Sequence, residues 1–245
     1  MGELIAVLSG KGGTGKTSVC AGLATALASR GNRVLCIDCD IGLRNLDIAL
    51  GIAQSDAPSF LEVCRGEYTL EQAHRHSVFP ELYFLTAPVN CSAEDIDRTA
   101  FSAMLRQARE KFQYVFLDAP AGVDLGFTLC ASYADRVILV TCPEPAAIRD
   151  AYRAGELLER MGKIDVRMVV NRVNKKLFEI MKVTVDDVMD EAALPLLGIV
   201  PEDSNVVLAA AFEKPLLRYG RKGAAAACRR IARRLQGQRV PVRLR

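Results

Sequence analysis

The sequence predicts an α/β protein with a mainly parallel, doubly wound sheet of seven or eight strands and helices on both faces. Short apolar runs rich in β-branched residues alternate with longer amphipathic segments along the 245 residues. Parallel strands require such crossovers, because the chain must return to the same end of the sheet before the next strand begins. The short runs are also almost continuously apolar, which is typical of strands buried on both faces.

The elements are expected in the following order along the chain. Apolar, β-branched runs predict strands at 4–8, 33–38, 82–85, 114–118, 136–141, 167–171 and 197–200. Amphipathic segments predict helices at 16–30, 94–110, 145–161 and 222–236, and shorter ones at 59–64 and 204–211. No repeat, linker or low-complexity tract divides the chain, so we expect one domain over 1–237 and a short basic tail over 238–245.

Composition excludes several classes of protein. Half of the residues are hydrophobic, which is enough to bury one large core. No apolar run approaches the roughly 18 residues that span a bilayer, and the N-terminus lacks the charged and apolar regions of a signal peptide. The start also lacks the Ser or Thr at position six that N-myristoylation needs. We therefore expect a cytoplasmic protein.

The eight cysteines do not have the spacing of a metal site. Only Cys36 and Cys39 form C-x-x-C, and they lie in the apolar run RVLCIDCD. Positions three apart on a strand point to opposite faces, so a metal shared by this pair is geometrically awkward. We expect reduced cysteines that pack as small hydrophobic residues.

The stretch SGKGGTGKTS, residues 9–18, follows the first predicted strand and opens the first predicted helix. It matches the P-loop pattern through Gly10, Gly15, Lys16 and Thr17. In that pattern glycines let backbone N–H groups surround phosphates, the lysine meets the β and γ oxygens, and the hydroxyl binds Mg²⁺. The sequence therefore predicts a P-loop NTPase. Lys11 is a second lysine that the pattern does not require.

Carboxylates follow two other predicted strands. Asp38 and Asp40 end the second strand, and Asp118 ends the run YVFLD. The carboxyl ends of parallel strands meet at one edge of a sheet, which is where ligands bind in such folds. Together with the P-loop these carboxylates predict a site for a nucleoside triphosphate and magnesium.

The motifs resemble those of the deviant Walker A ATPases, the ParA/MinD family, and within it the MinD branch. The resemblance covers nearly the whole chain. It is carried in order by SGKGGTGKTS, DCDIGLRNLD, DAPAG, PEPAAIRDA, VVNRV and PLLGIVPED. It implies a slow, partner-stimulated, Mg²⁺-dependent ATPase that forms an ATP-dependent homodimer and acts in septum-site determination. The implied partners are a MinC-like inhibitor and a MinE-like activator.

The resemblance also implies roles for individual residues. Lys11, Lys16 and Asp40 are the expected catalytic residues, with Lys11 reaching the partner's phosphates across the dimer. The expected nucleotide contacts are Gly10, Lys11, Gly12, Gly13, Thr14, Gly15, Lys16, Thr17, Ser18, Glu144, Asn171, Pro201 and Asp203. The expected metal residues are Thr17, Asp38, Asp40 and Asp118. Asn45, Glu144 and Asp150 match dimer-interface positions, and Asn171 matches the residue that reads adenine. Asp38 is also expected to couple the 38–51 segment to the nucleotide state. Sequence spacing leaves open that Lys11 only strengthens the positive field around its own nucleotide.

The C-terminal part is strongly basic. From Arg218 to Arg245 there are ten Arg and Lys and no Asp or Glu, which leaves 22 basic and 29 acidic residues before it. On a helix over 222–236, Ile231 and Leu235 fall on a small apolar face and the arginines on the other. We expect this helix to dock on the domain rather than to anchor a membrane, because membrane-surface helices usually carry bulkier apolar residues. The chain then stops, so the membrane-targeting helix typical of MinD is expected to be missing. Peripheral membrane association stays open as an alternative, but no clear targeting helix supports it.

Four alternatives stay open at this point. A flagellar-number ATPase shares the IGL-N-D type of switch sequence, which stands here as IGLRNLD. Such an ATPase usually has residues before its first strand, and this sequence lacks them. A ParA-like DNA-partitioning ATPase would place the basic tail on DNA, although IGLRNLD is a poor match to that branch, so DNA is not an expected partner. A nitrogenase-type reductase would need a cluster-binding pattern that Cys91 and Cys130 do not form. A scaffold that binds nucleotide without hydrolysis would differ only in an ATPase assay.

Overall fold

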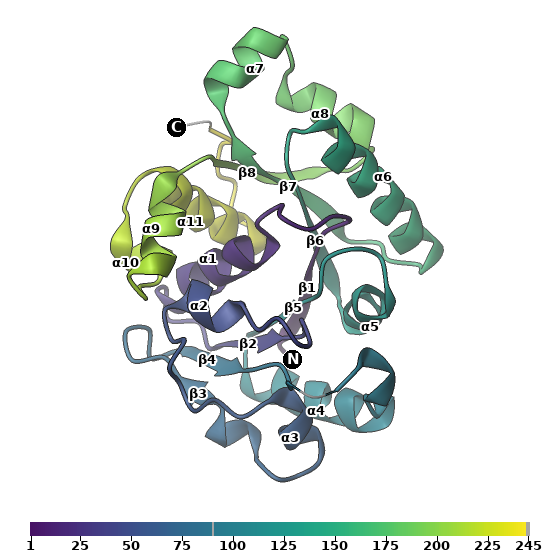
Figure 1. Cartoon of the computed structure of the whole chain (residues 1–245), viewed down its shortest axis with the longest axis vertical. Coiled ribbons are helices and arrows are strands. Elements are labelled where there is room, and N and C mark those ends of the chain that lie inside the picture. The colour runs from purple at the N-terminus through teal and green to yellow at the C-terminus, as the bar shows by residue number, and fades with distance from the viewer. Residues whose placement is uncertain (90, 244–245) are drawn as a thin grey trace.

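The computed structural model describes residues 1–89 and 91–243 and contains one eight-stranded sheet (Figure 1). The strand order is β3-β4-β2-β5-β1-β6-β7-β8, and all neighbours pair in parallel except β3 with β4. The strands are β1 Glu3–Leu8, β2 Val34–Asp38, β3 His74–Arg75, β4 Leu82–Leu85, β5 Tyr114–Asp118, β6 Arg136–Thr141, β7 Val166–Val173 and β8 Leu196–Pro201. The predicted doubly wound parallel sheet is confirmed.

Helices cover both faces of the sheet. They are α1 Lys16–Ala28, α2 Leu46–Leu50, α3 Phe60–Cys64, α4 Arg98–Lys111, α5 Leu125–Tyr133, α6 Pro145–Arg160, α7 Lys175–Met181, α8 Val185–Ala192, α9 Ser204–Ala211, α10 Leu216–Tyr219 and α11 Gly223–Leu235. One core cluster packs α1, α2, α9, α10 and α11 against one face of the sheet. A second cluster packs α3, α4, α5 and α6 against the other face. A smaller third cluster packs α7 and α8 against α6, β7 and β8.

The structure corrects several predicted boundaries. The helix expected over 94–110 is a short 3₁₀ turn at Ala93–Asp95 followed by α4, because the side chain of Asp97 caps the new helix by accepting from the N–H groups of Thr99 and Ala100. Helix α5 was not predicted, since LGFTLCASY is apolar on nearly all sides and shows no amphipathic period. Strand β3 has only two residues, too few for a pattern.

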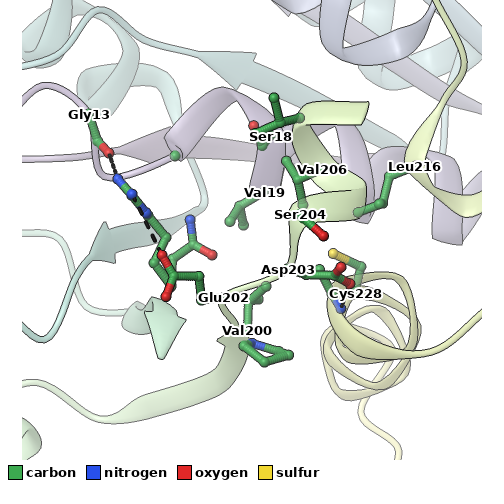
Figure 2. Close-up of a pocket in the computed structure, with 16 residues that line it drawn as sticks. Gly13, Ser18, Val19, Val200, Glu202, Asp203, Ser204, Val206, Leu216 and Cys228 are labelled. Atoms are coloured by element: carbon green, nitrogen blue, oxygen red, sulfur yellow. Dashed lines mark hydrogen bonds and ion pairs between the residues drawn. The ribbon is translucent and has the colours of Figure 1, made fainter. Parts of the chain in front are cut away.

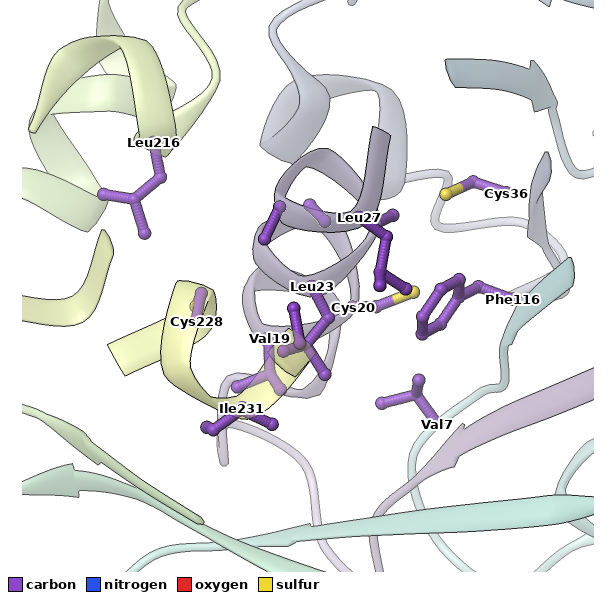
Figure 3. Packing of buried hydrophobic residues seen from close by; sticks show 14 of the residues in the cluster. Val7, Val19, Cys20, Leu23, Leu27, Cys36, Phe116, Leu216, Cys228 and Ile231 are labelled. Atoms are coloured by element: carbon purple, nitrogen blue, oxygen red, sulfur yellow. The ribbon is translucent and has the colours of Figure 1, made fainter. Parts of the chain in front are cut away.

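Helix α11 docks on the domain, as the sequence predicts. Ile231 and Leu235 are buried, and the helix packs against α1 and β8. Figure 3 shows Cys228 and Ile231 of α11 beside Val19 and Leu23 of α1. The approach is close, because a Cβ added at Gly22 of α1 would collide with the Cys228 sulfur. This helix therefore forms part of the core.

The tail after α11 folds back on it. The guanidinium of Arg234 donates to the carbonyl oxygens of Val240, at 2.8 Å, and of Leu197, at 2.7 Å. Residues 244 and 245 of the predicted tail lie outside the described residues. Among the described residues, none of the helices has both the length and the apolar character to cross a membrane.

Candidate nucleotide site

The P-loop connects β1 to α1 at the carboxyl edge of the sheet. Gly13 and Gly15 have φ angles of 80° and 83°, a region that side chains other than glycine rarely adopt. A Cβ on Gly10 would collide with the backbone carbonyl of Asp150, whereas nothing lies within 4 Å of a Cβ on Gly13. The glycines thus serve two different purposes: Gly10 allows close packing on α6, and Gly13 leaves an open concave loop.

Lys16 is buried in the first turn of α1 and forms an ion pair with Asp118 at the end of β5. Its Nζ lies 2.8 Å from Asp118 Oδ1, and both side chains are at most 6% exposed. Burial alone would lower the pKa of Lys16, but the neighbouring Asp118 carboxylate raises it above its ordinary value. The lysine is therefore held as a cation at the base of the loop.

The same region contains buried polar atoms without partners. Among the described residues, Thr14 Oγ1, Ser9 Oγ and Asp118 Oδ2 have no hydrogen-bond partner. Such orphaned atoms are costly in a folded protein and commonly mark a place that a ligand or ion completes. Thr17 Oγ1 lies 3.4 Å from Lys16 Nζ, so a hydroxyl, an ammonium and a carboxylate converge here.

Asp38 uses both carboxylate oxygens on the backbone of the segment that follows it. Oδ1 accepts from the N–H of Asp40 at 2.9 Å, and Oδ2 accepts from the N–H of Leu46 at 3.1 Å. Burial, reinforced by the negative charge of Asp118, raises the pKa of Asp38 to about 7. This geometry fits the predicted coupling of Asp38 to the 38–51 segment better than the predicted role in a metal site.

Asp40 is half-buried and lies just before an exposed turn at Gly42 and Leu43. Burial raises its pKa above the ordinary range, while Lys16 opposes that shift. Its backbone carbonyl accepts from the N–H groups of Leu43 and Arg44, and Arg44 adopts a left-handed φ of 46°. A carboxylate in this position could accept a hydrogen bond from a water molecule in the concave loop.

Lys11 lies at the outer rim of the loop. Its Nζ is 3.7 Å from Glu144 Oε2, and the two side chains are 42% and 64% exposed. Exposed pairs of this kind contribute little to stability. The structure therefore brings predicted residues Lys11 and Glu144 together on the surface, while the second lysine of the motif, Lys16, is buried. Gly12 and Asn45 are exposed, and Asp150 is half-buried, along the same edge.

A pocket of about 500 Å³ adjoins the P-loop (Figure 2). Predicted residues Gly13, Gly15, Ser18, Asn171, Pro201 and Asp203 line it. The amide of Asn171 donates to the carbonyl of Thr14 at 2.7 Å, which ties the end of β7 to the loop. Asp203 caps α9 by accepting from the N–H of Asn205, and its other carboxylate oxygen accepts from the N–H of Ala224 in the first turn of α11.

Sequence reasoning missed the apolar part of this pocket and two charged residues. Val19, Val200, Val206, Leu216 and Cys228 form its apolar wall. Arg172 and Glu202 also line the pocket, and both side chains are more than half exposed, so they form its rim. Each apolar residue on its own is indistinguishable from an ordinary core residue in the sequence. Arg172 had one usable signal, its place directly after Asn171 in VVNRV.

Comparisons with known proteins agree with this geometry. The family described as the CobQ/CobB/MinD/ParA nucleotide binding domain matches residues 5–216. The chain belongs to this family. The septum site-determining proteins MinD of Synechocystis and Bacillus subtilis are 36% and 37% identical to it, over 98% and 100% of this chain and 92% of each relative.

Solved structures narrow the assignment to the MinD branch. MinD in the MinC:MinD complex of Aquifex aeolicus superposes with a TM-score of 0.90 at 33% identity, covering 98% of each chain. MinD of Pyrococcus horikoshii, solved with Mg-ADP, superposes at 0.82 with 27% identity and 96% of each chain. A ParA family ATPase of Chlorobium tepidum is only 18% identical, at a TM-score of 0.83, and so shares the fold alone.

The chain is thus a MinD-type ATPase, and its Pyrococcus horikoshii relative was solved with ADP and Mg²⁺ bound. The residues present suit these ligands. The open loop at Gly13, the buried cation of Lys16 and the orphaned oxygens of Thr14 and Asp118 complement phosphate oxygens and a hydrated Mg²⁺. Within the described ranges no group of three His, Cys, Asp or Glu side chains could hold a metal by itself, and all eight cysteines are free thiols.

Proposed function

We propose that this MinD-type ATPase is a nucleotide switch for septum-site placement, in which Mg-ATP drives formation of a homodimer and slow, partner-stimulated hydrolysis releases it. The proposal extends the septum-site role of its MinD relatives to this chain. A MinC-like inhibitor is the proposed partner of the ATP form, by analogy with the Aquifex complex, and a MinE-like protein is the proposed activator.

One observation supports the dimer most directly. The two lysines of the motif are separated: Lys16 is buried against Asp118, whereas Lys11 is 42% exposed at the rim. A cation at the rim is accessible to phosphates of a second protomer facing this edge. There it would neutralise charge that develops on the γ-phosphoryl group, as an arginine finger does. The weak contact with Glu144 would hold Lys11 until the partner arrives.

In this proposal the remaining residues act within one protomer. The amides of the P-loop and Lys16 bind the phosphates, and Thr17 and Asp118 hold Mg²⁺ and its water. Asp40 orients the attacking water, and Asp38 transmits the nucleotide state to the 38–51 segment through its two backbone contacts. Asn171 reads the base, which Pro201 and Asp203 border.

The test is the oligomeric state of an Asp40→Ala variant, which should bind ATP without hydrolysing it. We expect a dimer by light scattering with Mg-ATP and a monomer with Mg-ADP. Adding Lys11→Ala should return the ATP form to monomer, whereas the control Lys214→Ala, an exposed lysine beyond α9, should not. The same dimerisation with and without Lys11 would refute the role of this lysine across the interface, and a monomer at saturating ATP would refute the switch.

A further inference from the structure

Arg172 is the residue of the pocket rim with the least ordinary backbone. It follows Asn171 near the end of β7 and has a φ of 55°, although it is not glycine. The pairing of β7 with β8 shifts register between Val170 and Val173, and Arg172 lies within this irregular stretch. Strained, bulged positions of this kind re-aim a side chain and cluster at functional sites.

The side chain of Arg172 connects the two sides of the pocket. Its Nη1 donates to the carbonyl of Gly13 in the P-loop at 3.5 Å, and its Nη2 lies 3.9 Å from Glu202 Oε1 after β8. Figure 2 shows this line of contacts running from Gly13 to Glu202. Both charged side chains are more than half exposed, at 55% and 51%. The contacts are long and solvated, so they can break and re-form at little cost.

The carboxylate of Glu202 is positioned by Asn174 at the start of α7. Its Oε2 accepts from the side-chain amide of Asn174 at 3.2 Å. Asn174 is the N-cap of α7 and also accepts from the N–H groups of Lys176 and Leu177. The acidic end of the contact is therefore fixed to a helix terminus, whereas the arginine end is the movable part.

We propose that Arg172 is a positioning residue that closes over the base of the bound nucleotide, with Glu202 as its anchor. The inference rests on the proposed nucleotide site and adds a residue that controls how long the nucleotide stays. A planar base between Asn171 and the apolar wall lies beside the guanidinium, and guanidinium groups stack favourably on the faces of aromatic rings. To do so, Arg172 gives up its weak contact with Gly13 and keeps its pairing with Glu202.

The experiment measures release of a fluorescent N-methylanthraniloyl-ADP from the Mg²⁺-loaded protein by stopped flow. Arg172→Asn removes the guanidinium and places a residue that tolerates left-handed φ, so the fold is preserved. We expect release about tenfold faster in Arg172→Asn, as loss of one stacked cation predicts. Arg172→Lys should be intermediate, and Glu202→Gln should accelerate release by a smaller factor. The control Arg160→Ala, at the exposed end of α6, should match the wild type.

Competition with inorganic tripolyphosphate, which has no base, identifies where Arg172 acts. The affinity for tripolyphosphate should be the same in Arg172→Asn and the wild type. An equal loss of affinity for tripolyphosphate would place Arg172 on the phosphates and overturn the proposal, as would unchanged release of the fluorescent nucleotide. A wild type that binds neither ATP nor ADP would instead overturn the nucleotide site itself.

Discussion

The phosphate end and the base end of the candidate site are built in opposite ways. The phosphate end is ten consecutive residues, 9–18, supplemented by carboxylates at the ends of β2 and β5. The base end is assembled from β7, β8, α9, α10 and α11, elements spread from Asn171 to Cys228. Binding of phosphates needs a cation and several backbone N–H groups that point into one concave loop, and few sequences provide this arrangement. A base needs shape and apolar area, which many sequences provide.

The two ends also differ in what they contribute to the fold. The phosphate end contains a buried ion pair and orphaned polar atoms, which cost stability in the absence of ligand. The base end shares Val19, Val200, Leu216 and Cys228 with the main hydrophobic core. Mutations at the first end should therefore affect binding most, and mutations behind the second end should affect folding most.

The largest expected effect is on the fold behind the base end. Leu235 of α11 is 5% exposed in the core that carries the pocket wall. Leu235→Asp places an unpaired charge there and should lower the free energy of unfolding by about 3–5 kcal/mol, as measured by urea denaturation. The control Arg233→Asp, at an exposed position of the same helix, should cost far less.

The result of Leu235→Asp also decides between the docked helix and a membrane helix. An unchanged melting temperature together with lost binding to anionic liposomes at physiological salt would contradict the docked helix. Liposome sedimentation must be compared at low and physiological salt, because the arginines alone give a weak, salt-sensitive attraction of about 1 kcal/mol per basic residue near the surface.

The second expected effect is on binding at the phosphate end. Lys16→Ala should weaken ATP binding by about 100-fold or more, because among the residues that the structure describes no other Lys or Arg is buried and able to replace the ammonium group. It should also reduce stability, since Asp118 is left buried without its partner. The double variant Lys16→Ala/Asp118→Asn should recover stability but not binding, by calorimetric titration and thermal melting. Recovery of binding in the double variant would contradict this separation of functions.

The smallest expected effect is a pH dependence behind α2, outside both ends of the site. His76 Nε2 lies 2.9 Å from the carbonyl of Leu50, and its Nδ1 accepts from the N–H of Val78 at 3.0 Å. Burial lowers the pKa of His76, so the folded protein resists a proton that the unfolded chain accepts. Its contribution to stability is therefore complete above the ordinary pKa of about 6.5 and is lost as the pH falls below it.

A matched variant isolates this contribution. The raised pKa of Asp38 works in the opposite direction, because it stabilises the fold as the pH falls below about 7. The comparison is therefore between the wild type and His76→Gln, each melted at pH 7.5 and 5.5. Relative to His76→Gln, the wild type should lose about 2 °C or less on acidification. An equal pH response in both proteins would show that His76 does not titrate on unfolding.

The sequence by itself determined the fold class, the strand ends that carry Asp38 and Asp118, and the P-loop with its glycines. These features depend on neighbouring residues, because a left-handed glycine or a buried apolar run is specified within a few positions. The resemblance of six short motifs to those of the ParA/MinD family also identified the family. Helix α5 was not predicted, because its apolar sequence has no periodic polar face.

Only the tertiary structure decided how these segments meet. It paired Lys16 with Asp118, directed both oxygens of Asp38 to the backbone, and separated the exposed Lys11 from the buried Lys16. It also brought Val19, Leu216 and Cys228 together in one pocket wall. In the sequence these residues look like ordinary core residues, so they do not indicate a pocket. Distances between residues far apart in the chain are set by the packing of whole helices on the sheet, which no local pattern of residues encodes.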